Sequence, residues 1–76
     1  MVALSYKHKG KIVKIHSTCF HDVESQHKIA NIGLVPGAII KVLDYNKSNH
    51  VLHLQVCNVE YVLRDEDCNL IYVEVV

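Results

Sequence analysis

The side chains best suited to chemistry in this 76-residue chain are a short run of sulfur and nitrogen ligands. His16, Cys19 and His21 follow the spacing His-x-x-Cys-x-His, which resembles a ligand set carried on a loop. Thiolate and imidazole groups suit Zn²⁺ or Fe²⁺. Six His residues occur in the chain, so a chance grouping is the alternative. No cofactor is otherwise indicated, and Fe²⁺ or Zn²⁺ at these three residues is the candidate metal site.

The cysteines offer a second kind of chemistry. Cys57 or Cys68, paired with a His, would form a nucleophile and its base. The sequence carries no glycine-rich phosphate loop, nucleophile elbow or paired-carboxylate pattern beside them. Buried structural thiols are the simpler interpretation, so we expect no enzymatic activity. The odd number of cysteines and their wide spacing do not form a secreted disulfide framework, which favours a reduced, cytoplasmic protein.

Aromatic side chains give a third candidate site. Tyr6, Tyr45, Tyr61 and Tyr72 would suit a peptide groove of the kind that aromatic residues line in SH3 domains. Tyr45 lies next to a polar segment and is the best of the four. Partial burial in a core, with the hydroxyl in water, is the alternative for the others.

Composition narrows the class of partner. The formal net charge is zero and the basic residues do not cluster, whereas a nucleic-acid-binding domain is usually clearly basic. The longest apolar runs are a few residues, far short of the roughly 20 that cross a bilayer. We therefore expect a single domain over residues 1–76 that binds no nucleic acid and does not insert into a membrane.

Periodicity places these residues on short elements. Alternating apolar residues predict a strand over 11–16. A helix is predicted over 22–32, with Asp22 as its N-cap and Gly33 in the left-handed position after its end. Pro36 followed by Gly37 predicts a type II turn.

The second half of the sequence reads as β-structure. Strands are predicted over 39–43, 51–57, 59–64 and 70–76, with a polar loop over 44–49 and one helical or 3₁₀ turn over 65–68. The strand at 39–43 has large apolar residues on both faces, so we expect it to be central and largely buried. Five short antiparallel strands hide their edges best in a small barrel.

Two segments carry a family resemblance. The run from Lys28 to Gly37 reads KIANIGLVPG, which resembles the helix and Leu-Gly-Leu/Phe-x-Pro-Gly turn of the ferrous iron transport protein A (FeoA) family. Tyr61 to Cys68 resembles the family's Ala-Leu-Arg-x-x-Glu-Ala segment, with Arg64 at its Arg, and Leu70 to Val73 resembles its terminal strand. We assign a structural role to five residues of these motifs, which are Gly33, Leu34, Pro36, Gly37 and Arg64.

The resemblance, which covers about Leu4 to Val75, implies a fold and a function. The fold is a mostly β, SH3-like barrel of about five antiparallel strands with one inserted α-helix and a short 3₁₀ turn before the last strand. The same module ends iron-dependent repressors. The function is that of a small cytosolic accessory of bacterial ferrous iron uptake, held at the inner face of the membrane by its partner.

The implied partner is the cytoplasmic GTP-binding domain of a ferrous iron permease. Val35, Tyr45 and Lys28 are the candidate contact residues. Two other functions stay open, which are an Fe- or Zn-binding carrier or sensor that uses the His/Cys loop, and a generic SH3-like peptide-binding module. Strand edges also leave homo-oligomers open.

Overall fold

A computed structural model describes all residues from Met1 to Val76. Six strands form one antiparallel sheet with the order β1-β6-β2-β3-β4-β5. The strands are β1 (Val2–Ala3), β2 (Ile12–Thr18), β3 (Ile39–Asn46), β4 (Val51–Val56), β5 (Val59–Arg64) and β6 (Ile71–Val75). The helices are η1 (Tyr6–His8, 3₁₀), α1 (Val23–Asn31) and α2 (Asp65–Cys68). The predicted mostly β, SH3-like fold is confirmed.

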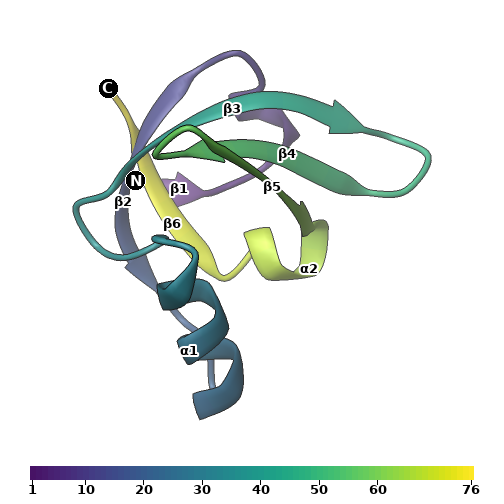
Figure 1. The fold of residues 1–76 in the computed structure, drawn as a ribbon. Coiled ribbons are helices and arrows are strands. Elements are labelled where there is room, and N and C mark those ends of the chain that lie inside the picture. Colours follow the sequence, from purple (N-terminus) through teal and green to yellow (C-terminus); the bar gives the residue numbers. More distant parts are fainter.

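The sheet curls around one core, with α1 projecting to one side of it (Figure 1). Fifteen buried apolar residues form this core. The predicted alternation supplies most of them, because every second residue of a strand faces inward. On β2 these are Val13 and Ile15, and on β4 they are Leu52, Leu54 and Val56.

The predicted helix ends are confirmed by hydrogen bonds. The Asp22 carboxylate accepts a hydrogen bond from the Ser25 N–H over 2.8 Å, which caps α1. At the other end Gly33 has φ +95°, and the Leu34 N–H donates to the Ile29 C=O over 3.1 Å. This bond defines a Schellman motif, and the buried Leu34 and Ile29 supply its apolar contact. Ile29 is the only buried residue of α1.

The predicted type II turn follows directly. The Ala38 N–H donates to the Val35 C=O over 3.0 Å, and Gly37 has φ +91°. Pro36 occupies the second turn position, where its fixed φ is favourable. The turn leads the chain from α1 into β3, the fourth strand of the sheet.

Two predictions for β3 were wrong in detail. The strand continues to Asn46, past a bulge between Val42 and Asp44, so half of the predicted loop over 44–49 is paired with β4. The strand is central in the sheet but buried on one face only. The Ile40 side chain is 1% exposed, whereas that of Ile39 is 52% exposed.

The first ten residues hold structure that the sequence patterns did not predict. Strand β1 makes a sixth strand, and the 3₁₀ helix lies at η1, whereas the turn at 65–68 is α-helical. His8 is buried, and its Nδ1 accepts a hydrogen bond from the Ser5 N–H over 3.1 Å. No helix in the structure is both long and apolar enough to cross a membrane.

Candidate protein-interaction groove

The continuation of β3 places Tyr45 in a groove at one end of the sheet. This groove of about 450 Å³ is lined by Tyr6, Tyr45, Lys47 and His50, and we call it the Tyr45 groove. The Tyr6 and Tyr45 ring centroids are 5.7 Å apart, with the ring planes tilted by 43°. Such a spacing lies in the favourable range for aromatic pairs. Tyr6 belongs to η1, so the N-terminal segment supplies half of the aromatic surface.

The Tyr45 hydroxyl is held by a carboxylate from another element. It donates a hydrogen bond to Asp65 Oδ2 over 2.7 Å. This bond favours the protonated phenol and raises the pKa of Tyr45 above its ordinary value. The His50 ring lies farther away, with its Nδ1 3.5 Å from the hydroxyl and 3.7 Å from the carboxylate. Asp65 is thereby the residue that fixes the ring of Tyr45.

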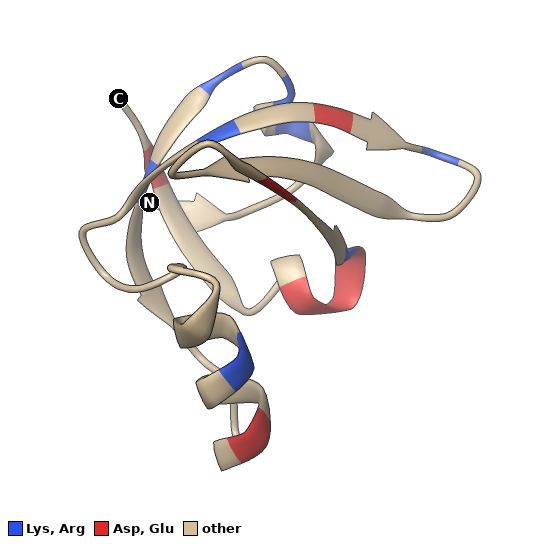
Figure 2. Cartoon of the chain, viewed as in Figure 1, with Lys and Arg blue, Asp and Glu red and all other residues tan.

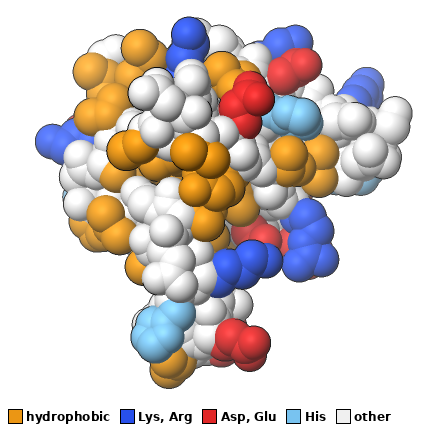
Figure 3. All heavy atoms as spheres, in the orientation of Figure 1, with side chains coloured by type: hydrophobic (Ala, Val, Ile, Leu, Met, Phe, Trp, Pro, Cys, Tyr) orange, Lys and Arg blue, Asp and Glu red, His pale blue; other side chains and the backbone are white.

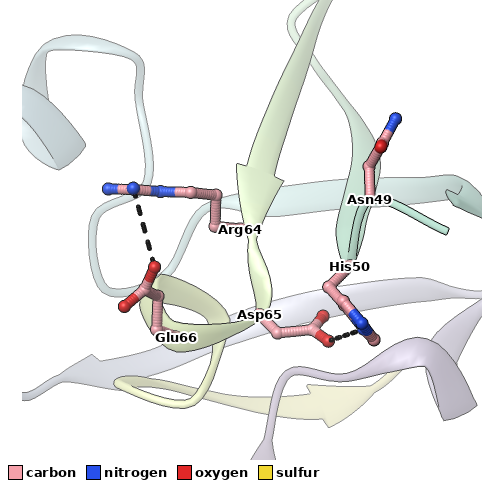
Figure 4. Close-up of a pocket in the computed structure, with 5 residues that line it drawn as sticks. All are labelled: Asn49, His50, Arg64, Asp65 and Glu66. Carbon is pink, nitrogen blue, oxygen red and sulfur yellow. Dashed lines mark ion pairs between the residues drawn. The ribbon is translucent and has the colours of Figure 1, made fainter. Parts of the chain in front are cut away.

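A second hollow adjoins the groove through His50. Asn49, His50, Arg64, Asp65 and Glu66 line this space of about 370 Å³, which we call the Asp65 pocket. Figure 4 shows the His50 and Asp65 side chains turned toward each other, and Arg64 reaching toward Glu66. The Arg64 guanidinium is 3.6 Å from the Glu66 carboxylate.

The two hollows together carry charges of both signs. Helix α2 carries Asp65, Glu66 and Asp67, and the other acidic residues, like Lys and Arg, are scattered over other parts of the chain (Figure 2). Lys47 and His50 lie on the side of the β3–β4 turn, and Asp65 and Glu66 lie on α2. The joined hollows therefore offer two aromatic rings flanked by both charges. This combination suits an extended polypeptide segment rather than a small apolar molecule.

Comparison with known proteins identifies the family. The FeoA domain model matches residues 2–75. The chain belongs to the FeoA domain family. No curated protein matches it.

Solved structures agree with the FeoA assignment. Iron(II) transport protein A from Clostridium thermocellum is 26% identical, with a TM-score of 0.81 over 90% of this chain and 41% of that protein. FeoA protein from Chlorobium tepidum is 20% identical, with a TM-score of 0.77 over 87% of this chain and 62% of that protein. The manganese-activated repressor ScaR shares the fold, at 21% identity and a TM-score of 0.80, over 96% of this chain and 35% of ScaR. This FeoA domain thus spans less than two thirds of each of these proteins.

The predicted contact residues of this FeoA domain do not all meet. Tyr45 lies in the groove. Arg64, predicted as a structural motif residue, lines the Asp65 pocket. Val35, 41% exposed, belongs to the type II turn, and Lys28 is exposed on α1. Neither lines the groove or the pocket. The motif residues Gly33, Leu34, Pro36 and Gly37 lie in the helix end and the turn that they were predicted to form.

The candidate metal ligands are likewise not assembled. His16 is exposed on β2, where its Nδ1 lies 3.1 Å from the Ser17 hydroxyl. Cys19 and His21 are exposed on the segment that leads to α1. The structure contains no group of three or more His, Cys, Asp or Glu residues arranged to hold a metal ion. Metal binding at these residues stays a prediction from spacing alone.

Four residues of the groove and the pocket were not predicted as contacts from the sequence. Tyr6 was expected to be partly buried in the core, Lys47 lies in the predicted loop over 44–49, Asp65 lies in the predicted turn over 65–68, and His50 was given no contact role. They come from η1, the β3–β4 turn and α2, which are far apart in the chain. No spacing rule links such residues, because only the tertiary fold brings them together.

Proposed function

We propose that this FeoA domain is an accessory of ferrous iron uptake that works by binding the cytoplasmic GTP-binding domain of a ferrous iron permease. Family membership and the 26% identity to an iron(II) transport protein A support the link to iron. The bound domain changes the assembly or nucleotide turnover of the permease by favouring one of its conformations. Docking at the permease would hold the domain at the inner face of the membrane.

The Tyr45 groove is the observation that carries the binding part of this proposal. Paired aromatic rings provide large contact area with little loss of side-chain freedom. Tyr45 is also held in place by the 2.7 Å hydrogen bond to Asp65, so its ordering costs little on binding. Lys47, which lines the groove, adds positive charge, which speeds encounter with an acidic partner surface.

The test is isothermal titration of the protein with the isolated GTP-binding domain of the ferrous permease from its own organism. Titrations are run without nucleotide, with GDP and with a non-hydrolysable GTP analogue. We expect saturable binding in at least one state. Absence of binding at high micromolar concentration in every state would rule out direct contact with that domain.

Matched lysine variants locate the surface. Lys47→Ala removes a groove charge, whereas Lys14→Ala removes an exposed charge from β2, outside both hollows. We expect Lys47→Ala and Tyr6→Ala to weaken binding and Lys14→Ala to leave it unchanged. Equal effects of the two lysine variants would place the contact elsewhere on the barrel.

The Tyr6–Tyr45 pair also favours a second candidate, a generic peptide-binding module. Proline-rich segments dock in aromatic-lined grooves because their extended helix is already formed. Chemical-shift changes at Tyr6 and Tyr45 on titration with a proline-rich peptide, without binding to the permease domain, would support this candidate. Binding to the permease domain, without shift changes on addition of the peptide, would support the accessory function.

A further inference from the structure

Strand β5 forms a free edge of the sheet. It pairs with β4 alone, and the opposite edge is the two-residue strand β1. Figure 1 shows β5 at the margin of the sheet. An unpaired strand presents free backbone N–H and C=O groups on which another strand can pair. Over its six residues β5 has no Pro, no Lys and no break in register, so three of the usual obstacles to such pairing are missing, and its charged residues are Glu60 and Arg64.

The β4–β5 hairpin fixes which backbone groups are free. Cys57 and Asn58 have φ 50° and 68°, as in a type I′ turn. Val56 and Val59, which flank this two-residue turn, therefore form the hydrogen-bonded pair that closes it. Bonded and non-bonded pairs alternate from there along antiparallel strands.

The free groups accordingly belong to alternate residues of β5. Just after the strand, the Asp65 N–H donates to the His50 C=O over 3.0 Å. Asp65 is an even number of residues from Val59, so this bond fits the alternation that starts at the closing pair. The residues between the bonded positions are Glu60, Val62 and Arg64. Their backbone groups point away from β4, toward the open edge.

The same three residues carry exposed side chains on the outer face. Glu60, Val62 and Arg64 are exposed, whereas Leu63 is buried. Along the strand the row is acidic, apolar and then basic, so a second copy running in the opposite direction presents the complementary order of charges. When two such rows run antiparallel with Val62 opposite Val62, Glu60 of each copy faces Arg64 of the other.

Other registers are less favourable. Only shifts that bring open backbone groups face to face allow hydrogen bonding. Shifting one strand by one allowed step in either direction places Glu60 or Arg64 opposite Val62. Shifting it by two steps places Glu60 opposite Glu60 or Arg64 opposite Arg64. Like charges directly opposite destabilise a strand pair, whereas opposite charges stabilise it. The charge row thus selects a single register.

We propose that β5 is a self-association surface through which two copies of this chain pair in antiparallel fashion, with Val62 on the twofold axis. The two Val62 residues exchange backbone hydrogen bonds, and the Arg64 N–H of each copy donates to the Glu60 C=O of the other. The contact is isologous, so it closes at two copies. Arg64 is available for it, because its contacts to Glu66 and Asp67 are long, at 3.6 and 4.0 Å, and its side chain is 67% exposed.

Such an interface is small and belongs to the weak, concentration-dependent class. Sedimentation velocity from about 10 μM to 1 mM protein at low salt tests for it, since surface charge pairs weaken as salt rises. We expect a monomer–dimer equilibrium within this range. A monomer at every concentration would overturn the proposal.

Charge reversal tests the register. Glu60→Arg and Arg64→Glu each place like charges opposite at both ends, and each should raise the dimer Kd about tenfold. An equimolar mixture of the two variants restores both opposite-charge pairs. We therefore expect it to form a heterodimer whose Kd equals that of the wild-type dimer. Lys14→Glu changes the net charge as much as Arg64→Glu, but on β2, and should leave the Kd unchanged.

Val62→Pro tests the backbone contact separately. Its ring removes an N–H that points away from β4, so the hairpin keeps its hydrogen bonds. Circular dichroism melting confirms that each variant is folded. We expect Val62→Pro to abolish dimerisation. A dimer that persists with Val62→Pro and with Glu60→Arg would place the interface on another surface and refute the proposal.

Discussion

Cys68 is the side chain whose acid–base chemistry departs most from its ordinary behaviour. It is 1% exposed in the core, and burial, with the nearby carboxylates of Asp65 and Asp67, raises its pKa to about 12. The thiolate is the reactive form. Cys68 is therefore an inert thiol, which matches the structural role predicted from the sequence. Cys57, predicted to be buried as well, is instead exposed in the β4–β5 turn.

A thiol count tests this contrast. With Ellman's reagent at pH 8, we expect Cys19 and Cys57 of the folded protein to react fast and Cys68 to react only on unfolding. In guanidinium chloride all three should react together. Equal rates for all three thiols in the folded protein would contradict the burial of Cys68.

The hydrogen bond between Tyr45 and Asp65 makes the stability of the protein depend on pH. Its pKa is raised by the hydrogen bond to Asp65, so the ionised phenolate is disfavoured in the folded state. The stability from this bond is fully present below the unfolded pKa of about 10 and is lost as pH rises through the folded pKa. We expect Tyr45→Phe to be less stable than wild type at pH 8, and the difference to shrink above pH 10. Urea unfolding of both proteins at several pH values measures it.

At the scale of elements, the junction of α1 and the turn depends on glycine. Gly33 has φ +95°, and a Cβ there would lie 3.1 Å from Cγ1 of Val56. Gly37 has φ +91° but open space around it. We expect Gly33→Ala to cost about 1–3 kcal/mol of unfolding free energy. Gly37→Ala should cost less, because its backbone is strained in the same way but the added Cβ contacts no other atom. Urea unfolding compares them, and equal costs would show that the Val56 contact relaxes freely.

Neighbouring isoleucines of β3 test its one-sided burial. Ile40→Ala removes a core side chain and should cost about 2–5 kcal/mol. Ile39→Ala removes one that is 52% exposed and should cost under about 1 kcal/mol. Denaturant unfolding of the two variants gives the comparison. A similar loss in both would mean that the outer face of β3 is covered in solution.

At the scale of the molecule, apolar side chains remain on the outside. Figure 3 shows several of them, orange, gathered on the face above α1. The protein is also small, and a domain of this length has a total stability of only about 4–11 kcal/mol. Ile40→Ala therefore removes a large fraction of the whole, and its unfolding should be measured at low temperature.

Net charge determines solubility at this scale. Lys and Arg number eight, and Asp and Glu number eight. The isoelectric point is about 7.0, so the net charge is near zero at pH 7 and positive at pH 5.5. We expect the polyethylene glycol concentration at the precipitation midpoint to be higher at pH 5.5 than at pH 7. The opposite order would mean that association through apolar surface outweighs charge.

The local elements were determined by the sequence itself. Asp22 caps α1 and Gly33 ends it, because a carboxylate beside free N–H groups and a residue that adopts positive φ act over one turn of chain. The Pro36–Gly37 turn and the alternation of β4 are local in the same way. These signals, with the motif at Lys28–Gly37, were enough to give the fold class and the family.

The sequence predicted Tyr45 as a contact residue, but the tertiary structure alone decided which residues surround it. Tyr6, Tyr45 and Asp65 lie on η1, β3 and α2, and only the curl of the sheet brings them within hydrogen-bonding and ring-stacking distance. The same long-range packing leaves His16 and Cys19 apart from any third ligand. Sequence spacing reports which side chains share an element, whereas contacts between elements depend on strand order and curvature, which no short stretch of chain encodes.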